Sequence, residues 1–348
     1  MRIGLLAPPW VPVPPPAYGG TEEVVDELAR GLGSRGHDVV LFATGDSTCP
    51  VRRRWVFDVP PVEMNASMPE CRHVQAAYDL LASCDVIHDH TTVGPIWAKA
   101  SGISTPIIAT VHNAFTDVSR PVYRQIASFA ALVAISNSHR DSAAGIPIRA
   151  VIRHGIDASR YSSGEGKGGY ALFLGRFAPE KGAGAAIRIA RLAGMPLVVA
   201  AKMRSADEVA YFESEIQPML GSDVRFVGEV SRSVRDELLR DAVALVNPIS
   251  WCEPFGLVMI EALASGTPVI AYPSGAAPEI VRDGVTGFLR SDEHAAARAL
   301  SSVTSIDRAR CRADVEGFFS ADRMVADYEN LYAEVVGGPS PTIGIEHG

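Results

Sequence analysis

Short apolar runs alternate with helix-like segments along most of the chain, and this alternation limits the possible folds more than any other feature. The expected strands lie at residues 2–7, 39–43, 85–88, 106–110, 131–135, 170–175, 197–201, 224–227, 244–247 and 269–272. Strands that are joined through helices form parallel sheets with helices on both faces. The sequence therefore predicts an α/β fold with functional groups at the carboxyl ends of the strands.

The length of 348 residues is enough for two domains of ordinary size. Residues 157–169 are rich in Ser and Gly, which is typical of a linker, and they separate two groups of strands. We therefore expect an N-terminal domain over 1–160 and a C-terminal domain over 165–318, each a doubly wound parallel sheet of the Rossmann type. Apolar residues recur at helical spacing over 322–336 and predict a C-terminal helix.

The composition excludes several classes of protein. The formal net charge of −8 argues against a nucleic-acid partner. The five cysteines are odd in number and show no C-x-x-C spacing, so we expect reduced thiols and a cytoplasmic protein. We identify no signal peptide, and no apolar run approaches the roughly 18–20 residues of a membrane span. Membrane association is not expected, although a peripheral contact stays open.

Residues 247–268 combine a strand, a polar loop and an apolar helix that Pro254 should open and Gly266 should close. Glu261 lies within this helix among apolar residues, and Glu253 lies on the loop before it. A buried carboxylate needs hydrogen-bond donors, which a polyhydroxylated ligand or a remote Arg could supply. The start of the helix favours a phosphate group.

Two other segments suit phosphate binding. Gly19-Gly20 follows the first strand, with Thr21 as an expected helix cap, and the glycines would let a diphosphate approach the backbone; a simple tight turn is the alternative. Arg176 and Lys181 follow the strand at 170–175, and we expect Lys181 to be exposed in an empty cleft. By themselves, these two residues could equally be ordinary surface cations.

Polar residues also gather at strand ends in the first half of the chain. They are His88, Asp89, His90, His112, Asn113 and Ser136. The His-x-His spacing with no third ligand nearby favours hydrogen bonding over a metal site. The glycines at 164, 166 and 169 fit G-x-G-x-x-G, but they precede a strand and open no helix, which argues against a dinucleotide site and a nicotinamide-dependent oxidoreductase.

Three of these segments resemble motifs of retaining GT4-type glycosyltransferases, in the order in which that family has them. Glu253 and Glu261, with Phe255-Gly256-Leu257 between them, resemble the E-x7-E motif of the family. Gly175-Arg176-Phe177 with Glu180-Lys181-Gly182 is similar to its phosphate-binding motif, and Gly19-Gly20-Thr21 to its glycine loop. The resemblance covers nearly the whole chain.

The resemblance implies the GT-B architecture, in which two Rossmann-like domains face each other across a cleft and the C-terminal helix returns to the first domain. It implies transfer of a sugar from a nucleoside diphosphate sugar, most simply a UDP-sugar, with retention at the anomeric carbon. Catalytic roles would fall to Glu253, His112, Arg176 and Lys181. Binding of the nucleotide sugar would fall to Gly19, Gly20, Arg176, Lys181, Val230, Phe255, Gly256, Leu257 and Glu261. We expect no cofactor and no metal, because the chain has no Asp-x-Asp motif.

The expected partners are the nucleotide-sugar donor and a sugar or small-molecule acceptor. The composition resembles that of a bacterial protein, and an intermediate of a natural-product or antibiotic pathway is the acceptor that we would test first. A glycolipid or polysaccharide acceptor, and a nucleotide-sugar binding protein without catalysis, are the alternatives.

Overall fold

The structure, a computed structural model, describes residues 1–338 and contains two parallel sheets. The strands are β1 (Arg2–Leu6), β2 (Asp38–Phe42), β3 (Arg52–Arg54), β4 (Val86–Asp89), β5 (Ile107–Thr110), β6 (Ala131–Ala134), β7 (Ala150–Val151), β8 (Ala171–Arg176), β9 (Leu197–Lys202), β10 (Val224–Gly228), β11 (Ala244–Asn247), β12 (Val269–Ala271) and β13 (Gly287–Leu289). The helices are α1 (Gly20–Ser34), α2 (Ser67–Leu81), α3 (Gly94–Ala100), α4 (Ser119–Ile126), α5 (Asn137–Ser142), α6 (Ala183–Leu192), α7 (Ala206–Tyr211), α8 (Arg232–Asp241), α9 (Leu257–Ala264), α10 (Ala277–Ile280), α11 (Glu293–Ser301), α12 (Arg308–Phe318) and α13 (Ala321–Gly337).

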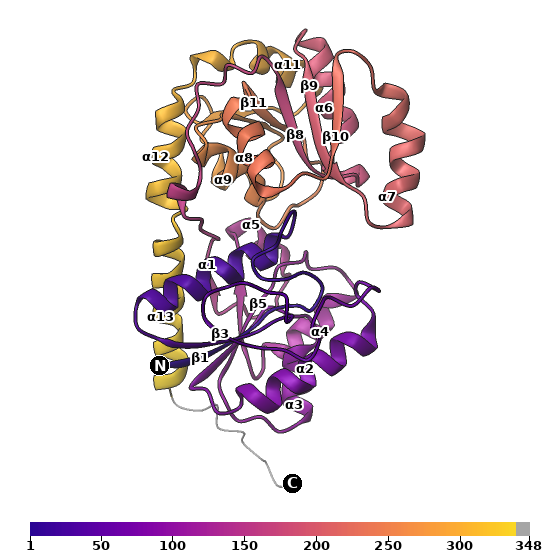
Figure 1. The fold of residues 1–348 in the computed structure, drawn as a ribbon. Coiled ribbons are helices and arrows are strands. Elements are labelled where there is room, and N and C mark those ends of the chain that lie inside the picture. The colour runs from indigo at the N-terminus through magenta and orange to yellow at the C-terminus, as the bar shows by residue number, and fades with distance from the viewer. Residues whose placement is uncertain (339–348) are drawn as a thin grey trace.

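Both sheets are doubly wound. The first has the strand order β3-β2-β1-β4-β5-β6-β7, and the second has the order β10-β9-β8-β11-β12-β13. Each half of the chain begins with a strand inside its sheet, β1 or β8. The next two strands extend the sheet to one edge, and the remaining strands extend it to the other edge, so the strand order reverses at β1 and at β8. Ligands of such sheets bind at this reversal, beyond the carboxyl ends of the strands. Figure 1 shows the first sheet in the lower half of the molecule and the second in the upper half.

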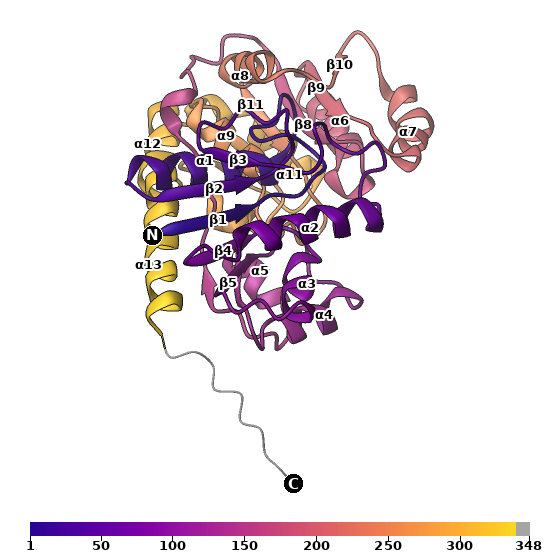
Figure 2. The same ribbon diagram turned by 60° about the horizontal axis from the view of Figure 1, so that its bottom comes forward.

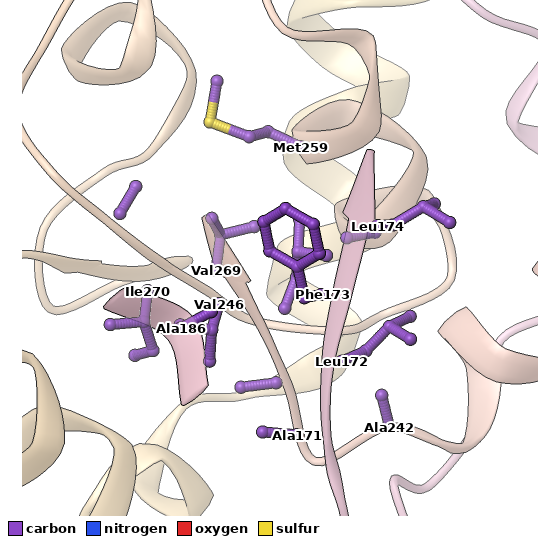
Figure 3. Close-up of a cluster of buried hydrophobic side chains, with 14 of the residues drawn as sticks. Ala171, Leu172, Phe173, Leu174, Ala186, Ala242, Val246, Met259, Val269 and Ile270 are labelled. Carbon is purple, nitrogen blue, oxygen red and sulfur yellow. The ribbon is translucent and has the colours of Figure 1, made fainter. Parts of the chain in front are cut away.

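The core of the second sheet explains why the helix α9 can be apolar nearly all round. Figure 3 shows Phe173 and Leu174 of β8 next to Val246 of β11 and Val269 of β12, with Met259 of α9 above them. Strands covered on both faces read as continuous apolar runs, as β8 and β11 do. Met259 and Ile260 of α9 are buried in this core, so packing positions the start of the helix.

The C-terminal helix α13 packs against the first half of the chain. Figures 1 and 2 show α12 beside the second sheet and α13 continuing down the side of the first. Tyr328 and Tyr332 of α13 are fully buried in the same apolar cluster as Val25 and Leu28 of α1. The predicted helix at 322–336 is thus present and one residue longer at each end.

The sequence predicts the fold class correctly, and the ends of the expected strands differ from the observed ends by at most one residue. It misses the edge strands β3, β7 and β13, which have only two or three residues each. The connection from 152 to 170 contains the predicted boundary, and we propose 1–160 and 165–318 as the two domains. Within residues 1–338, no helix is both long and apolar enough to span a membrane.

Candidate active site

A cavity of about 180 Å³ lies between the two halves of the chain, and residues from both halves line it. The first half contributes the loop from Pro15 to Thr21, together with His112 and His154. The second half contributes the carboxyl ends of β8, β9 and β11 and the start of α9. The cavity therefore lies where the doubly wound topology of each sheet predicts a site.

Lys181 and Glu253 form an ion pair in this cavity. The Nζ of Lys181 lies 2.7 Å from Oε2 of Glu253, and it also lies 5.6 Å from the centre of the Trp251 ring. Lys181 is only 9% exposed, so the expectation of an exposed lysine is wrong. The loop that carries Trp251 and Glu253 packs against the ammonium group and covers it.

Glu261 is paired with an arginine that is distant in the sequence. Its Oε1 lies 3.1 Å from Nη1 of Arg235 on α8, and it accepts a hydrogen bond of 3.4 Å from the Tyr161 hydroxyl. Burial alone would lower the pKa of Arg235, but the Glu261 carboxylate raises it above its ordinary value. Glu261 Oε2 forms no hydrogen bond within residues 1–338. This oxygen is not fully buried, so a ligand in the cavity can approach it.

The starts of α1 and α9 approach each other across the cavity. A Cβ on Gly20 would lie 3.2 Å from Leu257 Cδ1, so the glycine loop touches the first residue of α9. Gly256 precedes that helix with φ of +100°, a conformation that side chains other than glycine rarely adopt. Two helix N-termini therefore point bare N–H groups toward the same space. The helices start at Gly20 and Leu257, which corrects the expected cap at Thr21 and the expected start near Pro254.

His112 lies on the side of the cavity formed by the first sheet. Its Nε2 is hydrogen-bonded to Nδ1 of His90 at 2.9 Å, and its ring stacks on His154 with the centres 5.3 Å apart. Burial lowers the pKa of His112 to about 3, so its imidazole is neutral at neutral pH. Within the described residues, no group of three or more His, Cys, Asp or Glu side chains is arranged to hold a metal ion.

Comparison with known families identifies this architecture. Residues 18–160 match the family described as Glycosyltransferase Family 4, and residues 156–314 match Glycosyl transferases group 1. The two matches meet between the sheets and flank the cavity. The chain belongs to the GT4-type glycosyltransferases.

Relatives of this glycosyltransferase share its length and its GT-B fold. It is 28% identical over 351 residues to the phosphatidyl-myo-inositol mannosyltransferase of Mycobacterium leprae, with 90% of each chain covered. It is 26% identical to a solved glycosyltransferase involved in avilamycin A biosynthesis, with a TM-score of 0.75 and with 97% of this chain and 98% of that chain covered. The structure of Anabaena HepE in complex with UDP and glucose has a TM-score of 0.77 at 19% identity, covering 96% of this chain and all of that one, and it shows the same fold.

Most residues that the sequence predicts for the site of this glycosyltransferase line the one cavity. They are Gly19, Gly20, His112, Lys181, Val230, Glu253, Phe255, Gly256, Leu257 and Glu261. Arg176 is the exception, because its Nη1 lies 2.6 Å from Oε1 of Glu208 and its side chain is not part of the lining. Burial alone would raise the pKa of Glu208, but hydrogen bonds from the backbone N–H groups of Arg204 and Ser205 and from the Arg176 guanidinium bring it below the ordinary value.

Other cavity residues of this glycosyltransferase were not predicted from the sequence. Lys202 lies at the end of β9 with its Nζ 4.1 Å from the centre of the Tyr18 ring, and burial lowers its pKa to about 8. Its place directly after a predicted strand is a signal that could have identified it. Arg235 carried no such signal, because it lies within α8 and reaches Glu261 only through the tertiary fold.

Proposed function

We propose that this chain is a retaining glycosyltransferase that moves a sugar from a nucleoside diphosphate sugar, with UDP as the nucleotide, to a small acceptor. The observation that carries the proposal is that Lys181, Glu253 and Glu261 meet the Gly19-Gly20 loop in one cavity between the two sheets. A cation, two carboxylates and two helix N-termini suit a ligand that combines phosphates with hydroxyl groups.

The diphosphate leaving group gains negative charge as the bond to the sugar breaks. Lys181 can donate to its oxygens, and the first turns of α1 and α9 add oriented N–H groups beside it. The N–H groups of the two helix starts are oriented before the donor arrives, which makes electrostatic stabilisation effective, whereas Lys181 must exchange Glu253 for a phosphate oxygen. Arg176 can contribute only if it exchanges Glu208 for a phosphate oxygen.

The two carboxylates would serve different parts of the donor. Glu261 has Oε2 free, so it can accept hydrogen bonds from the ribose hydroxyls while Oε1 stays with Arg235. Glu253 lies on the loop before α9 and, once Lys181 turns to the phosphates, its carboxylate is available to the sugar ring. Glu253 lies before the helix, whereas Glu261 lies about one turn into α9, roughly 6 Å along its axis from Leu257, so the two carboxylates can reach different parts of one donor.

The acceptor that we propose is an intermediate of a natural-product pathway, which the likeness to the avilamycin glycosyltransferase supports. The likeness to a mannosyltransferase named for phosphatidyl-myo-inositol supports a glycolipid acceptor as the second candidate. Release of UDP from a UDP-sugar, compared with and without each acceptor class, separates the two. A protein that binds UDP-sugars and releases no UDP under any of these conditions would be a binding protein and would refute the transferase assignment.

A thermal-shift screen with UDP, GDP and ADP in the presence of EDTA tests the donor class. We expect UDP to raise the melting temperature more than GDP or ADP does. A ligand at about 100–1,000 times its dissociation constant stabilises the folded state by about 3–4 kcal/mol, which sets the expected size of the shift. EDTA should not alter this shift, since the chain has no Asp-x-Asp motif to hold a metal. A shift that appears only with added Mg²⁺ or Mn²⁺ would refute metal independence, and a larger shift with ADP or GDP would refute UDP as the nucleotide.

A further inference from the structure

Four buried histidines form a continuous row that ends at the cavity. His88 and His90 come from the end of β4, His112 follows β5, and His154 lies in the connection after β7. The ring centres of His88 and His90 are 4.1 Å apart, those of His90 and His112 are 5.2 Å apart, and those of His112 and His154 are 5.3 Å apart. Only His112 and His154 line the cavity, so His88 and His90 stand behind them.

The far end of this row is anchored to α13. His88 is hydrogen-bonded through Nδ1 to the Tyr332 hydroxyl at 2.8 Å and through Nε2 to Thr110 at 2.7 Å. The Tyr328 hydroxyl lies 2.8 Å from the same Thr110 oxygen. Both ring nitrogens of His88 thus have hydrogen-bond partners, which hold the ring in place, and His90 packs against it.

His90 has one hydrogen-bond partner, and that partner is His112. The bond joins Nδ1 of His90 to Nε2 of His112, while Nε2 of His90 is buried without a partner among residues 1–338. An orphaned buried N–H is rarer than an orphaned acceptor, so the single proton of neutral His90 belongs on Nδ1. Nε2 of His112 then accepts this hydrogen bond, and the proton of His112 must lie on its Nδ1.

We propose that His90 is a positioning residue that keeps the proton of His112 on Nδ1. Nδ1 of His112 forms no hydrogen bond with residues 1–338. This nitrogen is not fully buried and His112 lines the cavity, so a ligand there can reach it. His112 thereby presents a neutral N–H donor to an oxygen of the bound ligand. Burial reinforces this state, because it lowers the pKa of both imidazoles and keeps them uncharged.

The ligand that meets this donor is the sugar of the nucleotide-sugar donor, a step that rests on the proposed function. The tautomer of His112 itself is a property of the free protein and can be measured without any substrate. The experiment therefore has two readouts, one that depends on the transferase assignment and one that does not.

The test compares His90→Asn with His90→Leu. The amide nitrogen of Asn can occupy nearly the position of His Nδ1 and can still donate to His112, whereas Leu fills similar space and cannot donate. His73→Leu is the matched control, because His73 is a buried, neutral histidine whose Nε2 lies 2.9 Å from the carbonyl oxygen of Ala7 and which makes no contact with His112. Its loss should lower stability without changing the cavity.

The first readout is the ¹⁵N spectrum of histidine-labelled full-length protein, with His112 assigned by the signals that are lost in His112→Gln. In the wild type we expect a protonated Nδ1 for His112 and a protonated Nε2 for His73, which donates to a carbonyl oxygen and serves as an internal reference. His90→Asn and His73→Leu should preserve the His112 pattern, and His90→Leu should shift it toward protonated Nε2. A wild-type His112 with its proton on Nε2, or a pattern unchanged in His90→Leu, would overturn the proposal.

The second readout is turnover of UDP-glucose as the probe. His90→Leu should lower kcat by about five- to tenfold, the effect of one lost neutral hydrogen bond, while His90→Asn should restore most of it. Equal losses in both variants with the wild-type tautomer retained would also overturn the proposal. If the wild type turns over no nucleotide sugar at all, the proposed function fails, and the tautomer measurement still decides the role of His90.

Discussion

Replacement of each motif carboxylate by its amide should separate the two roles that we assign to Glu253 and Glu261. In Glu261→Gln, an oxygen that would accept from the ribose hydroxyls loses its charge. A hydrogen bond to a charged group contributes about 1.5–3 kcal/mol, so the dissociation constant of UDP should rise by about 10- to 150-fold. Arg235 keeps Asp236 as a second partner, with its Nη2 3.0 Å from Oδ1, so the variant should stay folded.

Glu253→Gln should behave in the opposite way. Its carboxylate holds Lys181 at 2.7 Å in the free protein, and the amide holds the ammonium less strongly. The diphosphate of UDP then meets a cation that is easier to recruit, so the affinity for UDP should stay within about threefold of the wild type or increase. Turnover of a UDP-sugar should fall sharply, because the carboxylate beside the sugar is gone.

Calorimetric titration of UDP into both variants measures the difference, and thermal unfolding confirms that each is folded. Glu180→Gln is the matched control, since it removes the same formal charge next to Lys181, and the Glu180 side chain forms a long ion pair of 3.9 Å with Arg176. A loss of UDP affinity in Glu180→Gln as large as that in Glu261→Gln would mean that net charge, and not contact, governs binding. Equal losses in Glu253→Gln and Glu261→Gln would refute the division of roles.

Three other perturbations probe the cavity and the contact between the two halves. Lys181→Ala should weaken UDP binding and lower the melting temperature because it leaves Glu253 unpaired, and the double variant with Glu253→Gln should recover the melting temperature but not the affinity. Glu279→Gln should weaken the contact between the two halves, since Glu279 accepts hydrogen bonds from the backbone N–H groups of Asn137 and Ser138 and from the Arg153 guanidinium. We expect a higher KM for the donor and a larger radius of gyration by X-ray scattering. An unchanged radius of gyration would contradict this. Burial raises the pKa of Glu22 to about 7, so the stability linked to its proton is complete below about pH 4.5 and is lost as the pH rises through 7. Glu22→Gln should therefore reduce the change in unfolding free energy between pH 5 and pH 8, measured in urea, by up to about 3 kcal/mol. An equal change in the wild type and the variant would argue against this.

The fold was predictable because its signals are local. A parallel strand that is covered on both faces is a continuous apolar run, and β8, β11 and β12 all read that way in the sequence. The edge strands β3 and β13 were missed because an edge strand needs little apolar surface; β3 consists of three arginines. Their pairing depends on the neighbouring strand, which the local sequence does not describe.

The candidate site was predictable in its residues and not in their partners. Glu253 and Glu261 were predicted from their spacing around the helix at 257–264, and Lys181 from its place after the strand at 170–175; all three line the cavity. The partner of Glu261 could not be found in the same way, because Arg235 lies 26 positions earlier on another helix and meets it only after the second sheet has formed. The burial of Lys181 is likewise a consequence of the loop that folds over it.

These partners change how ligand binding should be understood. The cations and carboxylates that we assign to the donor are already paired in the free protein: Lys181 with Glu253, Arg235 with Glu261 and Arg176 with Glu208. A buried charge without a partner is costly, and each of these groups has a partner of opposite charge before the ligand arrives. In the function that we propose, binding of a diphosphate is an exchange of partners at Lys181, and the Glu253 carboxylate that this exchange releases becomes available beside the sugar when the donor is in place.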